Sequence, residues 1–475
     1  MLFNSLDFAI FLPVVFLIYW FVAQKNLKLQ NALIVLASYV FYGWWDLRFL
    51  SLVIFSTVVD YLIGQRLRTE DKQFKRKALL WTSIIVNIGF LGFFKYYNFF
   101  LENFVDAFSV FGMQINANSL NIILPVGISF YTFQTLSYTI DVYRNKLEPT
   151  KDFVAFSAFV CFFPQLVAGP IERATNLLPQ FYKKRTFEYP KAVNGMRQIL
   201  WGLFKKVVIA DNCSEFANQI FNNSADMNGS TLVLGAIFFT FQIYGDFSGY
   251  SDIAIGTSRL FGFDLNQNFA TPYFSRDVAE FWRRWHISLS TWFRDYLYIP
   301  LGGSRGGTWM KVRNTFAIFL VSGFWHGANW TFIFWGLFHS ILFLPSFIFK
   351  TNRKYTTSII AENTLLPSPK EFTEVITTFT LVTVGWVFFR SETLVDAFSY
   401  LNQMIFDIEL PSINLTNTLI FVLFTISEFN IKGDERSISF SKYKLVNNSI
   451  YLIIGIFIIL FFFKKGEGSF IYFQF

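Results

Sequence analysis

The sequence predicts an all-α protein that crosses a membrane about ten to twelve times, with further helices that lie at the interface or re-enter the membrane. Of its 475 residues, 53% are hydrophobic and only 15% are charged, and the mean hydropathy is +0.40. Such a chain has too little polar surface for a water-soluble globule. Its apolar stretches are bounded by basic residues, as expected of helices, which satisfy their own backbone hydrogen bonds in lipid. The ten-residue alternation typical of a membrane β-barrel is not seen.

Charge and cysteine content argue against two other kinds of protein. The net charge of +8 and the pI near 9.2 are explained by basic residues at the cytoplasmic ends of spans, so no nucleic-acid partner is expected. Cys161 and Cys213 both lie in apolar context, so we expect neither a disulfide framework nor a metal site. The first stretch lacks a basic n-region and a small-residue cleavage site, which favours a retained span over a signal peptide. We find no linker or second soluble domain and expect residues 1–475 to form a single membrane domain.

The N-terminal part contains five candidate spans, at 6–23, 29–45, 49–64, 78–94 and 122–140. Between them, the loop 65–77 carries six Lys and Arg side chains, whereas the loop 95–121 carries only Lys95. Basic loops stay in the cytoplasm, so the first loop is predicted inside and the second outside. Counting back across the preceding spans places the N-terminus outside.

The middle of the chain departs from a simple series of spans. A candidate span at 153–169 runs into PQLVAGPIER at 164–173, whose two prolines and glycine predict an interrupted helix. Residues 192–211 are amphipathic, and Lys205 and Lys206 are placed to snorkel to the membrane interface.

The remaining candidate spans are 231–250, 374–389, 417–431 and 447–463. The first of them ends beside Asp246 and Asp252. Acids at such a place are either residues of the helix end and interface or members of a functional site.

The stretch 273–307 is too charged to cross the bilayer and too aromatic to be a free loop. At helical spacing, one side of it carries large apolar groups and a histidine: Trp282, Trp285, His286, Leu289, Trp292 and Phe293. We expect an amphipathic helix that lies in the interface or re-enters the membrane. His286 is then either a functional group or a buried histidine that hydrogen-bonds a carbonyl.

The longest uncharged run covers the 36 residues 314–349 and includes SGFWHG at 322–327. As one straight helix it would be about 54 Å long, against a hydrocarbon core of about 30 Å, so it should break. Gly323 and Gly327 mark the expected place, because glycine destabilises a helix interior. His326 stands at that break, and a titratable imidazole at membrane depth indicates a functional site. A buried histidine bonded to a carbonyl is the structural alternative.

The two tryptophan-flanked histidines, His286 and His326, suit one kind of chemistry. A hydroxyl is a poor nucleophile until a base within hydrogen-bond reach takes its proton, and a buried neutral imidazole suits that role. If a thioester is attacked, its carbonyl needs a donor for the developing charge, which a second histidine, Asn329 or a backbone amide could supply. The pattern GGSRG at 302–306 fits a nucleophile motif only within an α/β sheet, so a flexible turn, or a phosphate cradle beside Arg305, is expected instead.

Five segments stand out in chain order: FFPQLVAGPIER at 162–173, YGDFSGYSDIAIG at 244–256, FWRRWHISLSTWFRDYLYIPLGGSRGG at 281–307, SGFWHGANWTFIFWG at 322–336 and IYFQF at 471–475. Together they resemble the membrane-bound O-acyltransferase (MBOAT) superfamily, and in particular its bacterial alginate O-acetyltransferase branch. In that family the histidine of the W-H-G motif is catalytic and the histidine of R-R-W-H is its companion. The resemblance therefore implies His326 and His286 as the catalytic residues.

The resemblance also implies a multi-helix fold around a central tunnel that meets at the two histidines. The donor would be an acyl thioester on the cytoplasmic side, acetyl-CoA in this branch, with no permanently bound cofactor. The acceptor would be a hydroxyl of an extracytoplasmic polysaccharide, often reached through an SGNH-type partner protein, and the location the cytoplasmic (inner) membrane of a bacterium, in contact with membrane lipid. The expected substrate contacts are Arg283, Arg284, Trp285, Arg305, Asn329 and Trp330. For the three arginines, contact with lipid headgroups or solvent is the alternative.

Other functions stay open at the level of sequence. The related teichoic-acid D-alanyltransferases take their acyl group from a carrier protein's thioester, and the spans do not separate an acetyl from an alanyl donor. A transporter of lipid-linked sugar could use Asp246, Asp252 and His286 as a proton relay, but it should show matching repeat halves, which are not evident. A scaffold that recruits the true transferase would tolerate substitution of its histidines.

Overall fold

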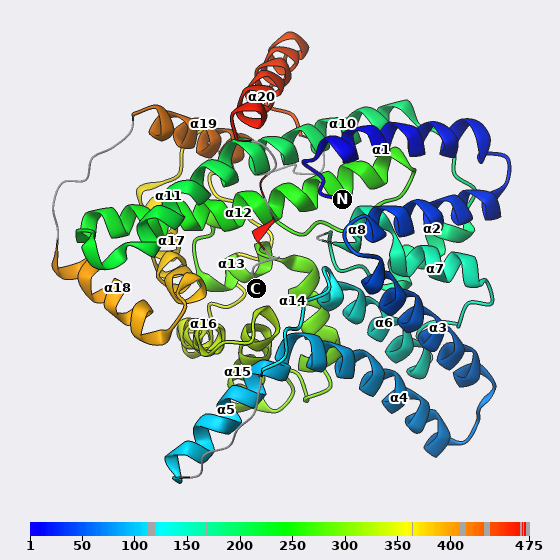
Figure 1. The fold of residues 1–475 in the computed structure, drawn as a ribbon. Coiled ribbons are helices and arrows are strands. Elements are labelled where there is room, and N and C mark those ends of the chain that lie inside the picture. The colour runs from blue at the N-terminus through cyan, green and yellow to red at the C-terminus, as the bar shows by residue number, and fades with distance from the viewer. Residues whose placement is uncertain are drawn as a thin grey trace. The chain divides into compact units, whose positions relative to one another are not determined.

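The computed structural model describes residues 1–112, 119–167, 169–362, 364–407, 415–431, 438–465, 468 and 470–471. Within this part of the chain every regular element is a helix, which confirms the all-α prediction (Figure 1). Most of the IYFQF segment, residues 472–475, lies outside the described residues.

Six helices of the described part are long and apolar enough to cross a membrane, as expected of a multi-pass membrane protein. They are Leu47–Thr69, Gln73–Val110, Gly229–Leu260, Trp330–Ile348, Pro369–Arg390 and Lys444–Phe463. Shorter apolar helices lie at Leu6–Val22, Phe153–Leu166 and Phe421–Ile431. The larger number of about ten to twelve spans stays a prediction, as does the central tunnel.

The chain forms two compact units. The first contains Met1–Ala192 and Ser258–Leu265, and the second contains Val193–Thr257 and Asn266–Phe475. That residues 1–475 act as one membrane domain stays a prediction. The helices of the first unit are α1 (Leu6–Leu17), α2 (Leu27–Gly43), α3 (Leu47–Thr69), α4 (Gln73–Leu91), α5 (Tyr97–Val110), α6 (Ile128–Tyr143), α7 (Phe153–Cys161), α8 (Phe163–Leu166) and α9 (Ala174–Leu177).

A buried carboxylate joins three helices of the first unit. Asp60 of α3 accepts hydrogen bonds from Ser83 and Asn87 of α4, at 2.5 and 2.8 Å, and from Thr139 of α6, at 3.1 Å. Its side chain is fully buried. Because a buried polar group is stable only when it is hydrogen-bonded, this cluster fixes how α3, α4 and α6 face one another.

The prediction of a loop at 95–121 was wrong for its first part, because residues Tyr97–Val110 form α5. Phe100, Phe104 and Phe108 recur every four residues there, which is the spacing of one helix face. The rings of Phe104 and Phe108 pack with centroids 4.5 Å apart. The prediction rested on the scarcity of Lys and Arg in this stretch, and the number of charges says nothing about the helical spacing of its phenylalanines.

The interrupted helix predicted around 164–173 is confirmed: α7 ends at Cys161, and α8 covers only four residues. Pro164 lies in the first turn of α8, where its missing N–H leaves no bond unmade. The span predicted at 122–140 starts later than expected, after Gly127, whose φ is +73°. A Cβ at Gly127 would lie 2.7 Å from the carbonyl oxygen of Leu166, so only glycine fits this turn.

The second unit contains all the residues predicted to be functional. Its elements are the end of α10 (Tyr189–Leu203), a π-helical turn (Phe204–Ala210), α11 (Asp211–Asn222), most of α12 (Gly229–Leu260), α13 (Val278–Arg284), α14 (Ile287–Phe293), α15 (Gly307–His326), α16 (Trp330–Ile348), α17 (Pro369–Arg390), α18 (Leu394–Phe406), α19 (Leu415–Ile431) and α20 (Lys444–Lys465). Both cysteines are buried, Cys161 in the first unit and Cys213 in α11 of the second.

Helices α15 and α16 lie side by side and approach closely through two glycines (Figure 1). A Cβ at Gly323 would lie 2.2 Å from the carbonyl oxygen of Phe332, and a Cβ at Gly336 would lie 2.2 Å from that of Phe319. Since atoms cannot approach so closely, the two glycines are required for this helix pair. Small residues serve the same purpose in other membrane helix pairs.

We expect Gly336→Ala to lower stability by about 1–3 kcal/mol, because the new methyl group overpacks the contact with Phe319. Thermal unfolding of the purified protein in detergent measures the change. Gly455→Ala in α20 is the matched control, since nothing lies within 4 Å of its new Cβ and alanine favours a helix. Equal unfolding temperatures for the two variants would contradict the tight packing described for α15 and α16.

Candidate active site

His326 is the last residue of α15, at the break between α15 and α16. The predicted break is confirmed at Gly327, where the backbone is extended, and is wrong at Gly323, which lies inside α15. Asn329 caps α16, because its Oδ1 accepts a hydrogen bond of 3.0 Å from the N–H of Thr331. Its amide nitrogen donates to the carbonyl of Glu392 at 2.8 Å. The side chain of Asn329 is thus engaged in holding the turn that presents His326.

Aromatic rings surround the imidazole of His326, whose residue is only 4% exposed. The ring centroids of Trp325, Trp335 and Phe389 lie 4.9, 5.2 and 5.3 Å from that of the imidazole. The three rings meet it edge-on, and together they come from the end of α15, from α16 and from α17. This packing fixes the plane of the imidazole and keeps bulk water from it.

His286 lies between α13 and α14 with a left-handed backbone, φ +44° and ψ +55°. The continuous amphipathic helix predicted for 273–307 is therefore wrong. A distant segment imposes the break, because the N–H of Ile287 donates to the carbonyl of Asn268 at 2.8 Å. A left-handed conformation is unfavourable for a residue with a Cβ, so the contacts around His286 must hold it there.

The side chain of Asn268 also contacts the imidazole of His286. Its Oδ1 lies 3.0 Å from Nδ1 of His286 and accepts a hydrogen bond of 2.8 Å from the hydroxyl of Ser288. His286 is only 1% exposed, and its Nε2 has no hydrogen-bond partner among the described residues. Burial lowers the pKa of His286 to about 3, so its imidazole is neutral at physiological pH.

One indole ring connects the two histidines. The centroid of Trp325 lies 6.1 Å from that of His286 and 4.9 Å from that of His326. Phe247 of α12 also packs against His286, at 4.6 Å and edge-on. The structure thus brings both predicted catalytic residues into one aromatic cluster of the second unit, and their catalytic roles stay predictions.

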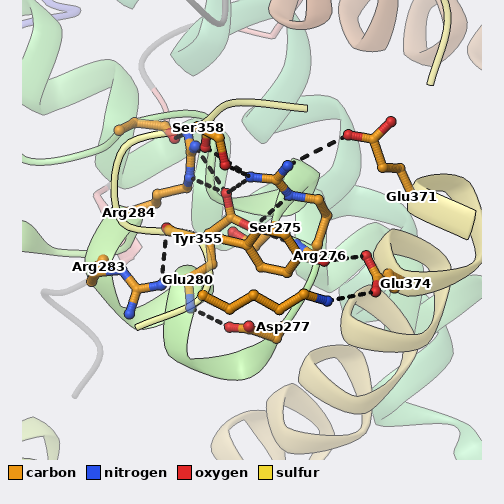
Figure 2. Close-up of polar contacts among 12 residues, drawn as sticks. Ser275, Arg276, Asp277, Glu280, Arg283, Arg284, Tyr355, Ser358, Glu371 and Glu374 are labelled. Carbon is orange, nitrogen blue, oxygen red and sulfur yellow. Dashed lines mark hydrogen bonds and ion pairs between the residues drawn. The ribbon is translucent and has the colours of Figure 1, made fainter. Parts of the chain in front are cut away.

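Two of the predicted substrate contacts, Arg283 and Arg284, bind protein groups in the structure (Figure 2). Arg283 donates to the carbonyls of Asn352 and Tyr355, at 2.9 and 3.1 Å. Arg284 forms an ion pair of 3.0 Å with Glu280 and donates to the carbonyl of Ala270 at 3.1 Å. Both guanidinium groups therefore fasten neighbouring segments to α13.

The other predicted substrate contacts differ in exposure. Trp285 is 1% exposed and stacks on Phe281, with centroids 5.6 Å apart. Trp330 is 54% exposed at the start of α16. Arg305 is exposed in its glycine-rich turn, and its guanidinium makes no hydrogen bond or ion pair with the described residues. Among these, Trp330 and Arg305 present surface to an incoming molecule.

The sequence did not predict the buried ion-pair network around Arg276. Figure 2 shows Glu280 between Arg276 and Arg284, and both pairs have N···O distances of 3.0 Å. The guanidinium of Arg276 also lies over the ring of Tyr355, 3.8 Å from its centroid, and donates to the carbonyl of Ser358 at 2.7 Å. Arg276, Glu280 and Arg284 are spaced four residues apart, and this spacing is the signal that could have identified them.

Two consecutive lysines are buried instead of snorkelling, so that prediction was wrong. Lys205 pairs with Asp252 at 2.5 Å, and Lys206 pairs with Asp246 at 2.9 Å and with Asp211 at 2.7 Å. Both lysines lie in the π-helical turn, and such turns are frequent at functional sites. Both aspartates of α12 lie within the helix rather than beyond its end, because α12 continues to Leu260.

Two cavities adjoin these ion pairs. The larger, of about 360 Å³, is lined by polar groups that include Lys206, Asp211, Glu215, Gln242 and Asp246. The backbone N–H of Ile471, near the C-terminus, donates to the carboxylate of Asp246. The smaller cavity, of about 20 Å³, is lined by Lys205, Asp252, Glu428 and Asn268 among others, and so reaches the residue that contacts His286.

The chain matches the model of the membrane-bound O-acyltransferase family over residues 147–359, a range that includes both histidines. It is 42% identical over 397 residues to a probable alginate O-acetylase of Pseudomonas aeruginosa, covering 83% of this chain and 73% of that protein. It is 36% identical over 435 residues to a peptidoglycan O-acetyltransferase of Helicobacter pylori, covering 85% and 80%. A teichoic acid D-alanyltransferase of Bacillus subtilis is 29% identical over 293 residues, covering 57% and 70%.

Proposed function

Because the chain belongs to the membrane-bound O-acyltransferase family, we propose that it moves an acetyl group from a cytoplasmic thioester to a hydroxyl of an extracytoplasmic polysaccharide or of a relay protein. The observation that carries the proposal is the pair of buried histidines, His286 and His326, that share Trp325 as a neighbour. A polysaccharide acceptor is supported by relatives named for alginate and for peptidoglycan.

In the proposed reaction the hydroxyl oxygen of the acceptor attacks the carbonyl carbon of the thioester while an imidazole takes the hydroxyl proton. The carbon–sulfur bond then breaks, and the thiolate leaves and is protonated, so that one ester and one thiol are formed. We assign the base to His326. The rings of Trp325, Trp335 and Phe389 around it exclude water, which would otherwise hydrolyse the thioester.

The proposed donor is acetyl-CoA, and no permanently bound cofactor is required. The exposed guanidinium of Arg305 suits a phosphate of such a donor. We place the protein in the cytoplasmic (inner) membrane of a bacterium with its N-terminus outside. The six basic side chains of residues 65–77, around the turn between α3 and α4, support this orientation. An SGNH-type partner protein on the outer side is part of the proposal, since it would receive or pass on the acetyl group.

Two alternative functions were considered at the level of sequence. D-alanyl transfer from a carrier-protein thioester is supported by the similarity to the Bacillus subtilis protein, which is lower than the similarity to the O-acetylases. The sugar transporter is set aside, since the chain belongs to an acyltransferase family and Asp246 and Asp252 pair with lysines in the structure.

The donor can be tested with purified protein in proteoliposomes, given radiolabelled acetyl-CoA or a D-alanyl-loaded carrier protein together with a polysaccharide fraction. We expect label from acetyl-CoA to appear as base-labile ester on the polysaccharide, or on an added partner protein. Transfer of D-alanine without transfer of acetate would replace the proposed donor by the alternative one.

A further inference from the structure

The amide group of Asn268 has a defined orientation. The backbone N–H of Ser288 can only donate, and it points to Oδ1 of Asn268 at 3.4 Å, as does the hydroxyl of Ser288 at 2.8 Å. On the other side, the amide nitrogen donates to the hydroxyl of Ser251 at 3.1 Å. Asn268 is 1% exposed, so water does not compete for these bonds. The oxygen of the amide is therefore the atom that faces His286.

This orientation decides where the proton of the imidazole sits. Nδ1 of His286 lies 3.0 Å from Oδ1 of Asn268, and a carbonyl oxygen can only accept, so Nδ1 must carry the proton. A neutral imidazole has one N–H, and the bond made by one ring nitrogen determines the state of the other. Nε2 of His286 is then a bare acceptor, buried and without a hydrogen-bond partner among the described residues.

Among the described residues, the side chains packed against the imidazole are aromatic and carry no charge. The rings packed against it are Phe247 from α12, Phe269 beside Asn268 and Trp325 from α15, at 4.6, 6.3 and 6.1 Å between centroids. Titratable groups on neighbouring elements line the small cavity that Asn268 also reaches: Lys205, Asp252, Tyr244 and Glu428. Lys205 pairs with Asp252, and Tyr244 donates to Glu428 at 2.5 Å.

We propose that Asn268 is a positioning residue that holds His286 with its proton on Nδ1, so that Nε2 accepts a hydrogen bond from an O–H or N–H group of a substrate. His286 in this state cannot donate to the oxyanion of the reaction, so that charge is stabilised by another group. Two substrate groups have the required chemistry: the hydroxyl of the acceptor and the amide N–H of a pantetheine thioester. The inference rests on the proposed function for the identity of the substrates, whereas the proton position can be measured without any activity.

The proton position is accessible because the chain has only three histidines. Protein labelled with ¹⁵N-histidine in lipid should give three imidazole signal pairs in solid-state NMR near pH 7, and His286→Gln identifies the pair that belongs to His286. We expect a protonated Nδ1 and an unprotonated Nε2 in the native protein, and a mixture of both forms in Asn268→Ala. A protonated Nε2 in the native protein would overturn the proposal even if acetyl transfer is confirmed.

Enzyme kinetics give a second, independent readout. Asn268→Ala should lower kcat/KM by about 10–100-fold, the effect of losing a partner that orients a functional histidine. The substrate whose KM rises in this variant is the one that Nε2 binds, which separates the acceptor hydroxyl from the pantetheine amide. Unchanged kcat and KM for both substrates would overturn the proposal.

Asn268→Asp keeps the oxygen that faces Nδ1 of His286 and adds a negative charge. It tests the proposal even if the Asn268→Ala variant does not fold. The charge favours the imidazolium, and the pKa of His286 should rise by about one to three pH units. Protonation of the ring removes the acceptor Nε2 of His286. The loss of activity at acid pH should therefore set in at a higher pH in Asn268→Asp than in the native enzyme.

Asn314, which is also fully buried and donates to the carbonyl of Gly303 at 2.9 Å, provides the matched control. The guanidinium of Arg313 donates to Oδ1 of Asn314 at 3.0 and 2.8 Å, so the new charge of Asn314→Asp has a counter-charge beside it. Asn314→Asp should not move the pH profile, and an equal shift in both variants would contradict the role given to Asn268.

Discussion

His326→Ala is expected to lower the rate of acyl transfer by about 10²–10⁴-fold, the usual contribution of a general base, while the protein remains in the membrane. The imidazole is the proposed base, and the rings that enclose it, from Trp325, Trp335 and Phe389, have no group that could replace it as a base. The measurement is ester-linked acetate on the polysaccharide of cells or membranes that carry the variant, at matched protein level. His326→Gln is a useful second variant, because it fills more of the space and has no basic nitrogen.

His339→Leu is the matched control for this experiment. His339 lies in α16, is fully buried and contacts Trp335, the same ring that packs on His326. Neither of its ring nitrogens has a hydrogen-bond partner among the described residues, so an apolar side chain of similar size should be tolerated. Full acetylation by His326→Ala, or its complete loss in a stable His339→Leu protein, would show that the base has been wrongly assigned.

Lys206→Met should destabilise the protein by about 3–5 kcal/mol, because it removes the buried cation that pairs with the buried carboxylate of Asp246. Lys206 is 1% exposed and pairs with both Asp211 and Asp246. The loss should appear as a lower unfolding temperature in detergent and a lower yield of folded protein. Lys206→Met combined with Asp246→Asn should recover part of the lost stability, since the buried charge of Asp246 is then removed as well.

A surface ion pair supplies the comparison. Lys191 and Asp264 lie 2.7 Å apart, with the aspartate side chain 68% exposed. Breaking such a pair changes stability by only about 0–1 kcal/mol, so Lys191→Ala should unfold close to the native temperature. If Lys206→Met and Lys191→Ala behaved alike, the buried ion pairs of the π-helical turn would not contribute to stability as described.

The sequence was most informative where the constraint is local. The uncharged run from 314 to 349 had to break, and the break occurs at Gly327, directly after His326. Gly323 was predicted to share in this break and does not, because a glycine inside a helix can also allow a close contact, here with Phe332 of α16. Sequence spacing does not distinguish these two uses of glycine.

The parts of the candidate site that could not be predicted depend on residues far apart in the chain. His286 continues the helical spacing of Trp282 and Trp285, and the turn at His286 is set by Asn268, which precedes it by 18 residues. Lys205 and Lys206 have the spacing of an interfacial helix, and their burial depends on acids of α12 more than thirty residues away. In both cases a polar partner from another segment decides the local structure, and the spacing of hydrophobic residues gives no information about such a partner.

Both cysteines of the chain, Cys161 and Cys213, are at most 1% exposed. A membrane-impermeant maleimide added to intact cells should therefore find no accessible native thiol in the folded protein. One cysteine placed on an exposed loop, for example at Asp71 in the basic segment 65–77, then becomes the single reporter of which side of the bilayer that loop occupies. The native chain is in this sense already prepared for labelling experiments that map its topology.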